Sequence, residues 1–364
     1  MRRTEHLAVT ALCLVLTATT TASAQAEDTS PTGRFSLFAS WATQDVDGYG
    51  TADRSELVAN LDLTSPRGHN GLEYAVDARV STYPAGDRDE RVSLYEAWIG
   101  SRSGDGRWRL RFGQMWLHDL GGLGSVGGLH AEYRARSRGR LGRVRIGLFG
   151  GLEPEILDFD YASNVTKGGA YVAVDGSGGR KHVVGYVQIE NDDLTERSVL
   201  LVRNSIPLKR KLFIYQIAEY DLEGAAETGD GDLRYLFASV RYRPVKQLGL
   251  QATYHYGRSI DLRTITEDIL AGRPVDPALV EGFLFESTRA RATVYPMRGM
   301  RAWVSWGKSR NNRGDTSSDR AGAGFSWANI ATSGFDLSAT ASRIDRDGGS
   351  SYDSWYATIG RGFG

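Results

Sequence analysis

One acidic segment has the residue spacing of a calcium-binding loop. In DVDGYGTADRSE, residues 45–56, the residues at positions 1, 3, 6, 9 and 12 of an EF-hand loop are Asp45, Asp47, Gly50, Asp53 and Glu56. Tyr49 stands where the fifth position usually supplies an oxygen ligand, and the flanking residues alternate as strands do. Since Asp-Gly pairs are also common in hairpin turns, we interpret the segment as a solvated loop and expect neither a metal nor a cofactor.

Nucleophilic catalysis would need a hydroxyl or thiol nucleophile beside a histidine base. Beyond residue 26 the histidines are His69, His118, His130, His182 and His255. None of them lies in a recognisable nucleophile motif, and His130 and His255 fall on the polar side of alternating segments. A polar lining explains them more simply, so we expect no enzymatic function.

Charged residues at every second position form a third pattern. The basic members of the candidate site are Arg79, Arg109, Arg111, Arg134, Arg136, Arg145 and Arg291, and its acidic members are Asp62, Asp77 and Glu96. A basic ladder beside an acidic patch would create the transverse field that ion pores use at a constriction. The same residues could instead form cross-strand ion pairs that brace a wall. The two interpretations are compatible, and the sequence leaves both open.

The elements that must position these residues are β-strands. In the stretch RATVYPMRGMRAWVSWGKSR, residues 291–310, and just before it, Ala290, Ala292 and Val294 share one side, while Arg289 and Arg291 share the other. Arg301 and Ser305 follow on the same polar side after a turn. Because a side-chain period of two indicates strands, we count about eighteen such runs of roughly nine to eleven residues, the length of a tilted membrane-crossing strand.

The connectors alternate between short turns and longer polar loops, as they do in transmembrane barrels. The longer set comprises residues 45–54, 83–91, 117–128, 154–167, 223–232, 261–284 and 311–318. Segment 117–128 contains apolar residues such as Leu120 and Leu123 among glycines, so we expect it to fold inward. Segment 261–284 has helix-like pieces broken by Pro274 and Pro277, which suits a lid, a plug or an adhesive surface.

Residues 1–26 have the features of a secretory signal, with a basic start at Arg2 and Arg3, an apolar stretch and a small-residue cleavage pattern. The single cysteine, Cys13, would leave with that signal, and no later segment has the roughly 20 apolar residues of a membrane-spanning helix. The net charge of zero gives no reason to expect a nucleic-acid partner.

The last run, SWYATIGRGFG, resembles the closing strand of Gram-negative outer-membrane barrels of the porin type. Trp355, Ala357, Ile359 and Phe363 share one side, although Arg361 also falls on that side and Gly364 follows the terminal aromatic. At the level of architecture the resemblance covers the whole chain after residue 26. It implies an all-β fold, a transmembrane antiparallel up-and-down β-barrel of about eighteen strands, with sixteen as the fallback, formed by residues 27–364 as one domain.

If the chain forms such a barrel, the apolar side of its strands faces outer-membrane lipid and the arginines face the lumen. We therefore expect a passive diffusion channel for small polar solutes in the cell outer membrane of a Gram-negative bacterium, weakly anion-preferring and acting as a monomer or a homotrimer. The alternative is a barrel with a filled lumen that serves as a structural or surface-binding protein. A soluble β-protein is a third reading, but it would have to bury the arginine rows in its core at a high desolvation cost.

Overall fold

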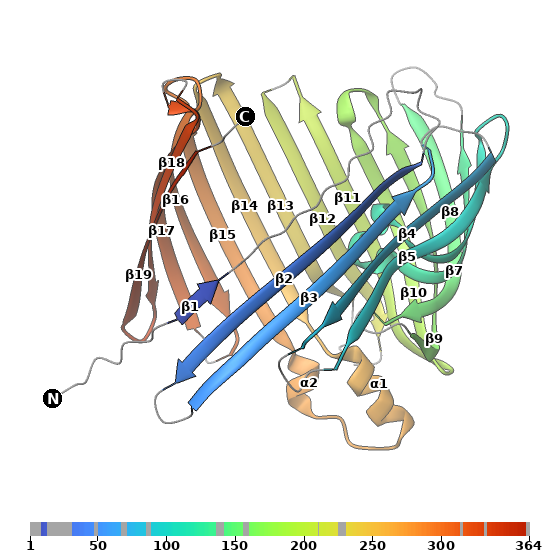
Figure 1. The fold of residues 1–364 in the computed structure, drawn as a ribbon. Coiled ribbons are helices and arrows are strands. Elements are labelled where there is room, and N and C mark those ends of the chain that lie inside the picture. Colours follow the sequence, from blue (N-terminus) through green and yellow to red (C-terminus); the bar gives the residue numbers. More distant parts are fainter. Residues whose placement is uncertain are drawn as a thin grey trace. The chain divides into compact units, whose positions relative to one another are not determined.

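The computed structural model describes residues 9–12, 31–46, 50–66, 71–84, 89–135, 142–155, 160–209, 211–224, 231–313, 316–330 and 333–361. Its strands form antiparallel pairs with their chain neighbours (Figure 1). Within the described residues, one short strand, β1, precedes eighteen longer ones, β2 to β19. The prediction of an all-β, up-and-down antiparallel chain of about eighteen strands is therefore confirmed.

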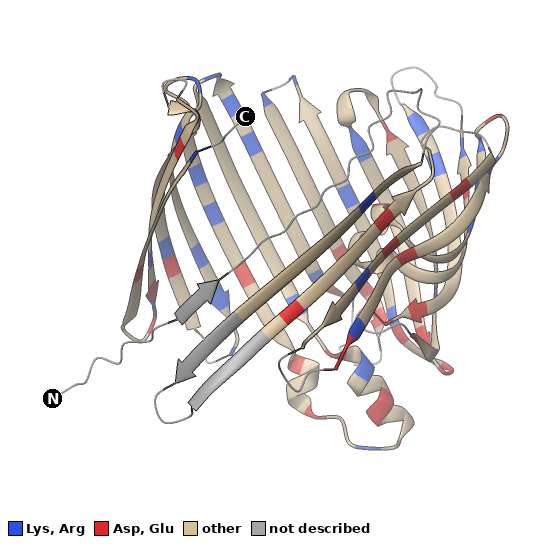
Figure 2. Cartoon of the chain, in the orientation of Figure 1, with Lys and Arg blue, Asp and Glu red and all other residues tan. Residues whose placement is uncertain are grey.

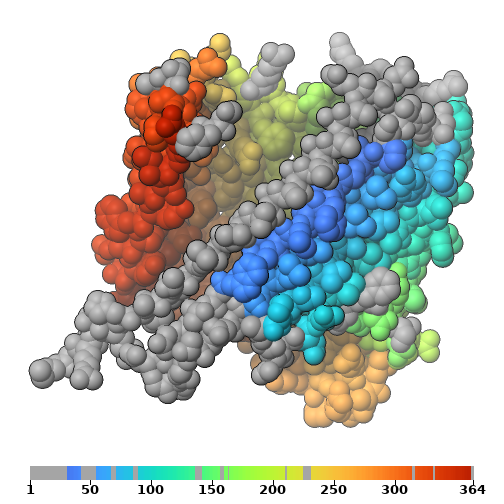
Figure 3. Space-filling view, viewed as in Figure 1, coloured from blue at the N-terminus to red at the C-terminus, as the bar shows by residue number. Residues whose placement is uncertain are grey.

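The chain forms two compact units, of which the first contains residues 1–135 and 146–169. Its elements are β1 (Val9–Leu12), β2 (Thr32–Val46), β3 (Gly50–Thr64), β4 (Gly71–Thr82), β5 (Arg91–Arg102), β6 (Trp108–Trp116), the 3₁₀ segment η1 (His118–Gly124), β7 (Ser125–Arg134), most of β8 (Arg143–Pro154) and the first part of β9 (Tyr161–Asp175). Figure 3 shows β3 to β5 of this unit as a continuous surface coloured blue to cyan.

The second unit contains residues 136–145 and 170–364. After the end of β9, its elements are η3 (Ser177–Gly179), β10 (Lys181–Asn191), β11 (Leu194–Leu208), β12 (Leu212–Gly224), β13 (Asp232–Val245), β14 (Leu248–Ser259), the helices α1 (Leu262–Leu270) and α2 (Pro277–Glu281), β15 (Phe283–Val294), β16 (Met300–Asn311), β17 (Thr316–Trp327), β18 (Phe335–Arg346) and β19 (Ser350–Arg361). The helices form a compact body at the ends of β14 and β15 (Figures 1 and 3).

The expected strand length of nine to eleven residues is too short for much of the chain. The long strands range from the 9 residues of β6 to the 15 residues of β2, β3, β9 and β11. The extra residues near the strand ends stay in the ladder of paired residues, which continues a strand whether or not its side chains alternate.

This lengthening corrects three of the expected long loops. Of residues 45–54, the described ones belong to strands, since β2 ends at Val46 and β3 begins at Gly50. Likewise, only residues 155–160 separate β8 from β9, and only residues 312–315 separate β16 from β17. A further connection, between β10 and β11, is a two-residue turn in which Asp192 has a positive φ of 51°. The side chains of the candidate calcium ligands Asp45, Asp47 and Asp53 lie outside the described part of the structure.

The N-terminal strand β1 lies inside the segment predicted to be a secretory signal. It pairs with β2 through Val9 opposite Gln44 and Leu12 opposite Trp41. A mature chain that begins at residue 27 would lack this strand and retain β2 to β19. The prediction of a signal at residues 1–26 and a single domain over 27–364 stays a prediction.

Two segments between strands are packed instead of extended. In η1 the side chains of Leu120 and Leu123 are buried, as are Asp119 and Gly124. That this segment folds inward stays a prediction. In α1, Asp261 is the N-cap and accepts a hydrogen bond from the Thr264 backbone, and Ile265 is fully buried. No helix in the described residues is long and apolar enough to cross a membrane.

The turn between β5 and β6 shows how the short connections are held. Asp105 accepts hydrogen bonds from the Ser103 hydroxyl at 2.6 Å and from the Arg107 backbone N–H at 3.1 Å. These hydrogen bonds, first the one from Ser103, hold the pKa of the Asp105 carboxyl below its usual value. The carboxylate therefore stays ionised, and the turn keeps both bonds, well into the acidic range.

Candidate functional site

The two sides of the strands differ in chemistry. In β6 the side chains of Trp108, Leu110 and Phe112 are more than half exposed, and they alternate with Arg109 and Arg111. The same alternation recurs in β15 and β16, in the second unit. We call the side that carries Trp108 in β6 and Val304 in β16 the apolar face, and the side that carries Arg109 in β6 and Arg291 in β15 the charged face.

Glu73 is the centre of an ion network on the charged face of the first unit. Its buried carboxylate lies 2.7 Å from Nη2 of Arg102 and 2.5 Å from Nε of Arg109. The register places Arg102 directly opposite Arg109 across β5 and β6. Glu73 thus separates two arginines that would otherwise repel each other, and the charge of Arg109 is committed to this network.

Arg111 is hydrogen-bonded to a histidine. Its Nε and Nη2 lie 3.2 and 3.0 Å from Nδ1 of His130, a side chain that is only 1% exposed. The guanidinium groups of Arg109 and Arg111 also lie over the Trp98 ring, 5.5 and 5.1 Å from its centroid, where cation–π attraction favours them. His130 is therefore a partner that positions an arginine.

The other basic candidates on these strands are paired with carboxylates. Arg134 Nε lies 2.6 Å from Glu132, and Arg79 Nη2 lies 3.4 Å from Glu56. In the second unit, Arg145 Nε lies 2.6 Å from Asp175. Arg136 lies outside the described residues. These contacts support the bracing interpretation for these arginines.

The three acidic candidates form one row. Asp62 of β3 lies directly opposite Asp77 of β4, which lies directly opposite Glu96 of β5. Like charges in directly opposed positions are destabilising, so such a row persists where water or mobile cations can screen it. Trp98 donates a hydrogen bond to Glu96 at 3.3 Å. The described residues contain no group of three or more histidine, cysteine, aspartate or glutamate side chains that could hold a metal ion.

A second ion network crosses β11 to β14. Asp221 accepts hydrogen bonds from Arg197 at 2.9 Å and from Arg234 at 2.8 Å, and its side chain is 6% exposed, as is that of Arg234. Asp232 continues the network by pairing with Arg258 at 2.8 Å. This network was not predicted from the sequence, because a register shift beside Tyr235 turns Arg234 onto the charged face.

This second network anchors the helical segment. Arg258 donates hydrogen bonds to the backbone carbonyls of Glu281 at 3.0 Å and Val280 at 3.3 Å. Arg263 of α1 pairs with Glu196 of β11 at 2.8 Å. The α1–α2 segment is thus fixed at both helices to the strands of its own unit, so it lies packed on the strands as a lid or plug would.

Removing both anchors should release the segment. In the double variant Arg258→Gln plus Arg263→Gln, we expect limited proteolysis within residues 261–282 to become roughly tenfold faster, because each lost ionic contact contributes up to about 1 kcal/mol to the closed state. The control is Arg273→Gln, since the partner of Arg273 among the described residues is Asp268, inside the segment, at 2.7 Å. Equal cleavage rates in all three proteins, measured by mass spectrometry of the fragments, would contradict the anchoring role.

Four arginines on the charged face of β15 to β17 differ from all of these. Within the described residues, none of Arg289, Arg291, Arg301 and Arg320 forms an ion pair. Arg291 stacks on the Trp303 ring at 4.2 Å, with its Nε buried and without a protein hydrogen-bond partner, and Arg301 donates to the Ser326 hydroxyl at 2.7 Å. Figure 2, which colours basic residues blue, shows several of them along β15 and β16.

The neighbours of these arginines are small and polar. Arg291 lies opposite Ser305, which lies opposite Gly322, and Arg289 lies opposite Gly307, which lies opposite Arg320. Their positive charge is therefore not cancelled by any carboxylate on adjacent strands. Of this set, only Arg291 belongs to the candidate site predicted from the sequence.

No family model and no curated protein matches the chain. The chain is similar in fold to several solved structures. OccAB4 of Acinetobacter baumannii is 12% identical over 92% of this chain and 99% of that one, with a TM-score of 0.44. OccK2 (OpdF) of Pseudomonas aeruginosa is 15% identical over 91% and 97%, with a TM-score of 0.45. A BenF-like porin from Pseudomonas fluorescens Pf-5 is 10% identical over 90% and 97%, with a TM-score of 0.46. The function of this chain is therefore inferred from its own residues.

Proposed function

We propose that this chain is a porin-like channel of the Gram-negative outer membrane that lets small polar solutes diffuse passively. The observation that carries the proposal is the chemistry of the two faces. The apolar face exposes large side chains such as Phe112 at 62% and Val304 at 59%, which is unfavourable in water but suits lipid. The opposite face is rich in arginine, serine and carboxylates, which a water-filled lumen would solvate.

The proposal includes processing and closure. Residues 1–26 direct export and are removed, and residues 27–364 insert as one domain whose sheet closes into a barrel, because an open edge within lipid would leave backbone groups without partners. The protein acts as a monomer or a homotrimer and needs no cofactor or metal. Its partners are outer-membrane lipid and the solutes.

The channel is weakly anion-preferring in this proposal. The arginines Arg289, Arg291, Arg301 and Arg320 supply positive potential that no neighbouring carboxylate cancels, which raises the local concentration of anions. The acidic row of Asp62, Asp77 and Glu96 opposes that effect. The preference therefore rests on the β15–β17 arginines instead of Arg109, Arg134 and Arg145, whose charges are paired.

A specific observation favours a second candidate, a barrel with a filled lumen that serves as a structural or surface-binding protein. On the charged face of β10 and β11, Val183, Val187, Val199 and Leu201 are at most 1% exposed. An open, water-filled lumen would wet this patch, whereas packed segments such as α1, with its buried Ile265, would keep it dry. The two candidates share a fold and differ in whether solutes pass.

Liposome swelling tests the proposal. Purified protein is a folded barrel if it migrates faster on gels when unheated than after boiling. Vesicles that contain the folded protein should swell in solutions of small neutral sugars. They should swell faster in small organic anions than in organic cations of equal size. Folded protein that leaves vesicles impermeable to all of these solutes would favour the filled-lumen candidate. A protein that purifies as a water-soluble monomer without detergent would exclude both candidates.

A further inference from the structure

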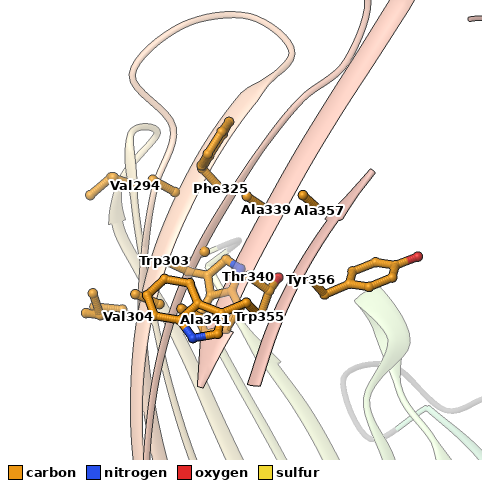
Figure 4. A pocket seen from close by; sticks show the side chains of 14 residues that line it. Val294, Trp303, Val304, Phe325, Ala339, Thr340, Ala341, Trp355, Tyr356 and Ala357 are labelled. Carbon is orange, nitrogen blue, oxygen red and sulfur yellow. The ribbon is translucent and has the colours of Figure 1, made fainter. Parts of the chain in front are cut away.

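The apolar face of β15 to β19 contains a groove of about 820 Å³ (Figure 4). Its floor consists of small side chains: Ala292, Ala302, Ala323, Ala339, Ala341 and Ala357. In Figure 4, Trp355 lies beside Val304 and Ala341, while Val294, Phe325, Ala339 and Ala357 mark the neighbouring row. Large side chains such as Trp306, Trp327 and Ile359 lie elsewhere on the same face, so the groove is a local depression in it.

The strand register produces the groove. Phe325 lies opposite both Ala302 and Ala339, and Ala339 lies opposite Ala357. In the next row, Ala341 lies between Ala323 and Trp355. The alanines are aligned across neighbouring strands, so the groove is about one side chain deep. Phe325 and Trp355 border it with large apolar surfaces. Such a groove fits a flexible hydrocarbon chain.

A cation stands on the same face beyond one end of the groove. Along β19, alternation places Trp355, Ala357, Ile359 and Arg361 on one side. Arg361 lies opposite Phe335, and its guanidinium stacks on that ring, 5.0 Å from the centroid. At about 3.4 Å per residue, Arg361 is roughly 14 Å from Ala357 along the strand.

The row between the groove and Arg361 is still apolar. It contains Met300, Trp327, Leu337 and Ile359, which are paired across the strands. Tryptophan is enriched at the boundary between hydrocarbon and headgroups. Because Arg361 comes one row after Trp327, it stands at the level of lipid headgroups, while the groove lies within the hydrocarbon layer.

We infer that this face binds an anionic phospholipid, with an acyl chain in the alanine groove and the phosphate at Arg361. The inference rests on the proposed location in a membrane and goes beyond it, since it assigns a lipid of stated charge to a particular place on the wall. A second copy related by a twofold axis fits less well, because groove would face groove and leave a void where interfaces need close packing. A neighbouring copy in a homotrimer is an alternative occupant that the test below distinguishes.

Fluorescence quenching by brominated lipids tests this inference. Trp355 borders the groove and is 83% exposed, so its fluorescence reports on a brominated acyl chain in the groove. The fluorescence of Trp355 is obtained as the difference between the wild type and Trp355→Phe. Two vesicle mixtures are compared: brominated phosphatidylglycerol with unlabelled phosphatidylcholine, and unlabelled phosphatidylglycerol with brominated phosphatidylcholine. From the quenching in the two mixtures, we expect the groove to prefer the anionic lipid roughly fivefold, the effect of one arginine near an anionic headgroup.

Two variants separate the headgroup from the chain. Arg361→Gln should abolish the preference and leave quenching by both lipids. Ala341→Leu, which fills the groove opposite Trp355, should weaken quenching by both lipids, whereas Ala290→Leu, on the same face opposite Trp306, should not.

Three results would overturn the inference. Equal quenching by the two lipids in the wild type, or an unchanged preference in Arg361→Gln, would mean that Arg361 does not select the headgroup. Quenching of other tryptophans but not Trp355 would mean that protein, such as a second copy, covers the groove. Absence of quenching at every tryptophan would mean that the chain is not in the bilayer, and the proposed function would fail as well.

Discussion

Replacing Asp221 with asparagine should lower the free energy of unfolding by about 3–5 kcal/mol, the usual cost of removing one partner from a buried ion pair. Among the residues that the structure describes, the carboxylates that pair with Arg234 are Asp221 at 2.8 Å and Asp232 at 3.9 Å. Arg197 would keep Glu219 at 3.2 Å, but Arg234 would remain as a buried charge without a close partner. The prediction can be measured by urea unfolding in detergent micelles.

The matched control is Asp345→Asn. Asp345 pairs with Arg343 at 2.9 Å, but both side chains are more than half exposed, so water screens the pair and its loss should leave the free energy of unfolding close to the wild-type value. If the two variants lose equal stability, the β11–β14 network does not brace the wall as its burial implies.

Reversing the charge of Arg289 and Arg291 together should turn the weak anion preference of the channel into a cation preference. Unit charges 8 Å apart in water interact by about 0.5 kcal/mol, and the double variant Arg289→Glu plus Arg291→Glu changes four charge units. With screening at 0.1 M salt, the ratio of anion to cation permeability should fall by roughly threefold or more. Reversal potentials under a salt gradient measure this ratio.

The control for selectivity removes a paired arginine together with its partner. In Arg145→Gln plus Asp175→Asn, the lost charges cancel, so the reversal potential should stay at the wild-type value. If this control shifts the reversal potential while Arg289→Glu plus Arg291→Glu does not, the β15–β17 arginines are not the source of the selectivity. The electric field in the lumen would then be set by the basic residues predicted from the sequence, which include Arg145.

The alternation around Arg291 shows why the architecture could be predicted. Ala290, Ala292 and Val294 share the apolar face of β15, as expected, because a strand places every second side chain on the same side whatever its neighbours are. The count of about eighteen strands follows from the same period. Strand ends were harder to predict: residues 45–54 look like a loop by composition, but β2 continues to Val46 and β3 begins at Gly50.

Ion partners could not be predicted, because they depend on the register between strands. Arg109 and Glu73 are 36 residues apart in the chain, and nothing local couples them. The bulge that brings Arg234 beside Asp221 also cannot be predicted from the alternation of side chains. One signal was present, however: residues 287–314 contain seven basic residues and no acidic one, so the arginines of β15 and β16 could have been identified as unneutralised before their strands were paired.

Single-channel recording in planar lipid bilayers tests the channel most directly. Protein that has been verified as folded by its heat-modifiable migration should insert to give discrete, long-lived conductance steps, and its reversal potential should show a weak anion preference that shrinks as salt concentration rises. Repeated insertion of folded protein without any conductance step would contradict the channel and leave the filled-lumen barrel as the function of this chain.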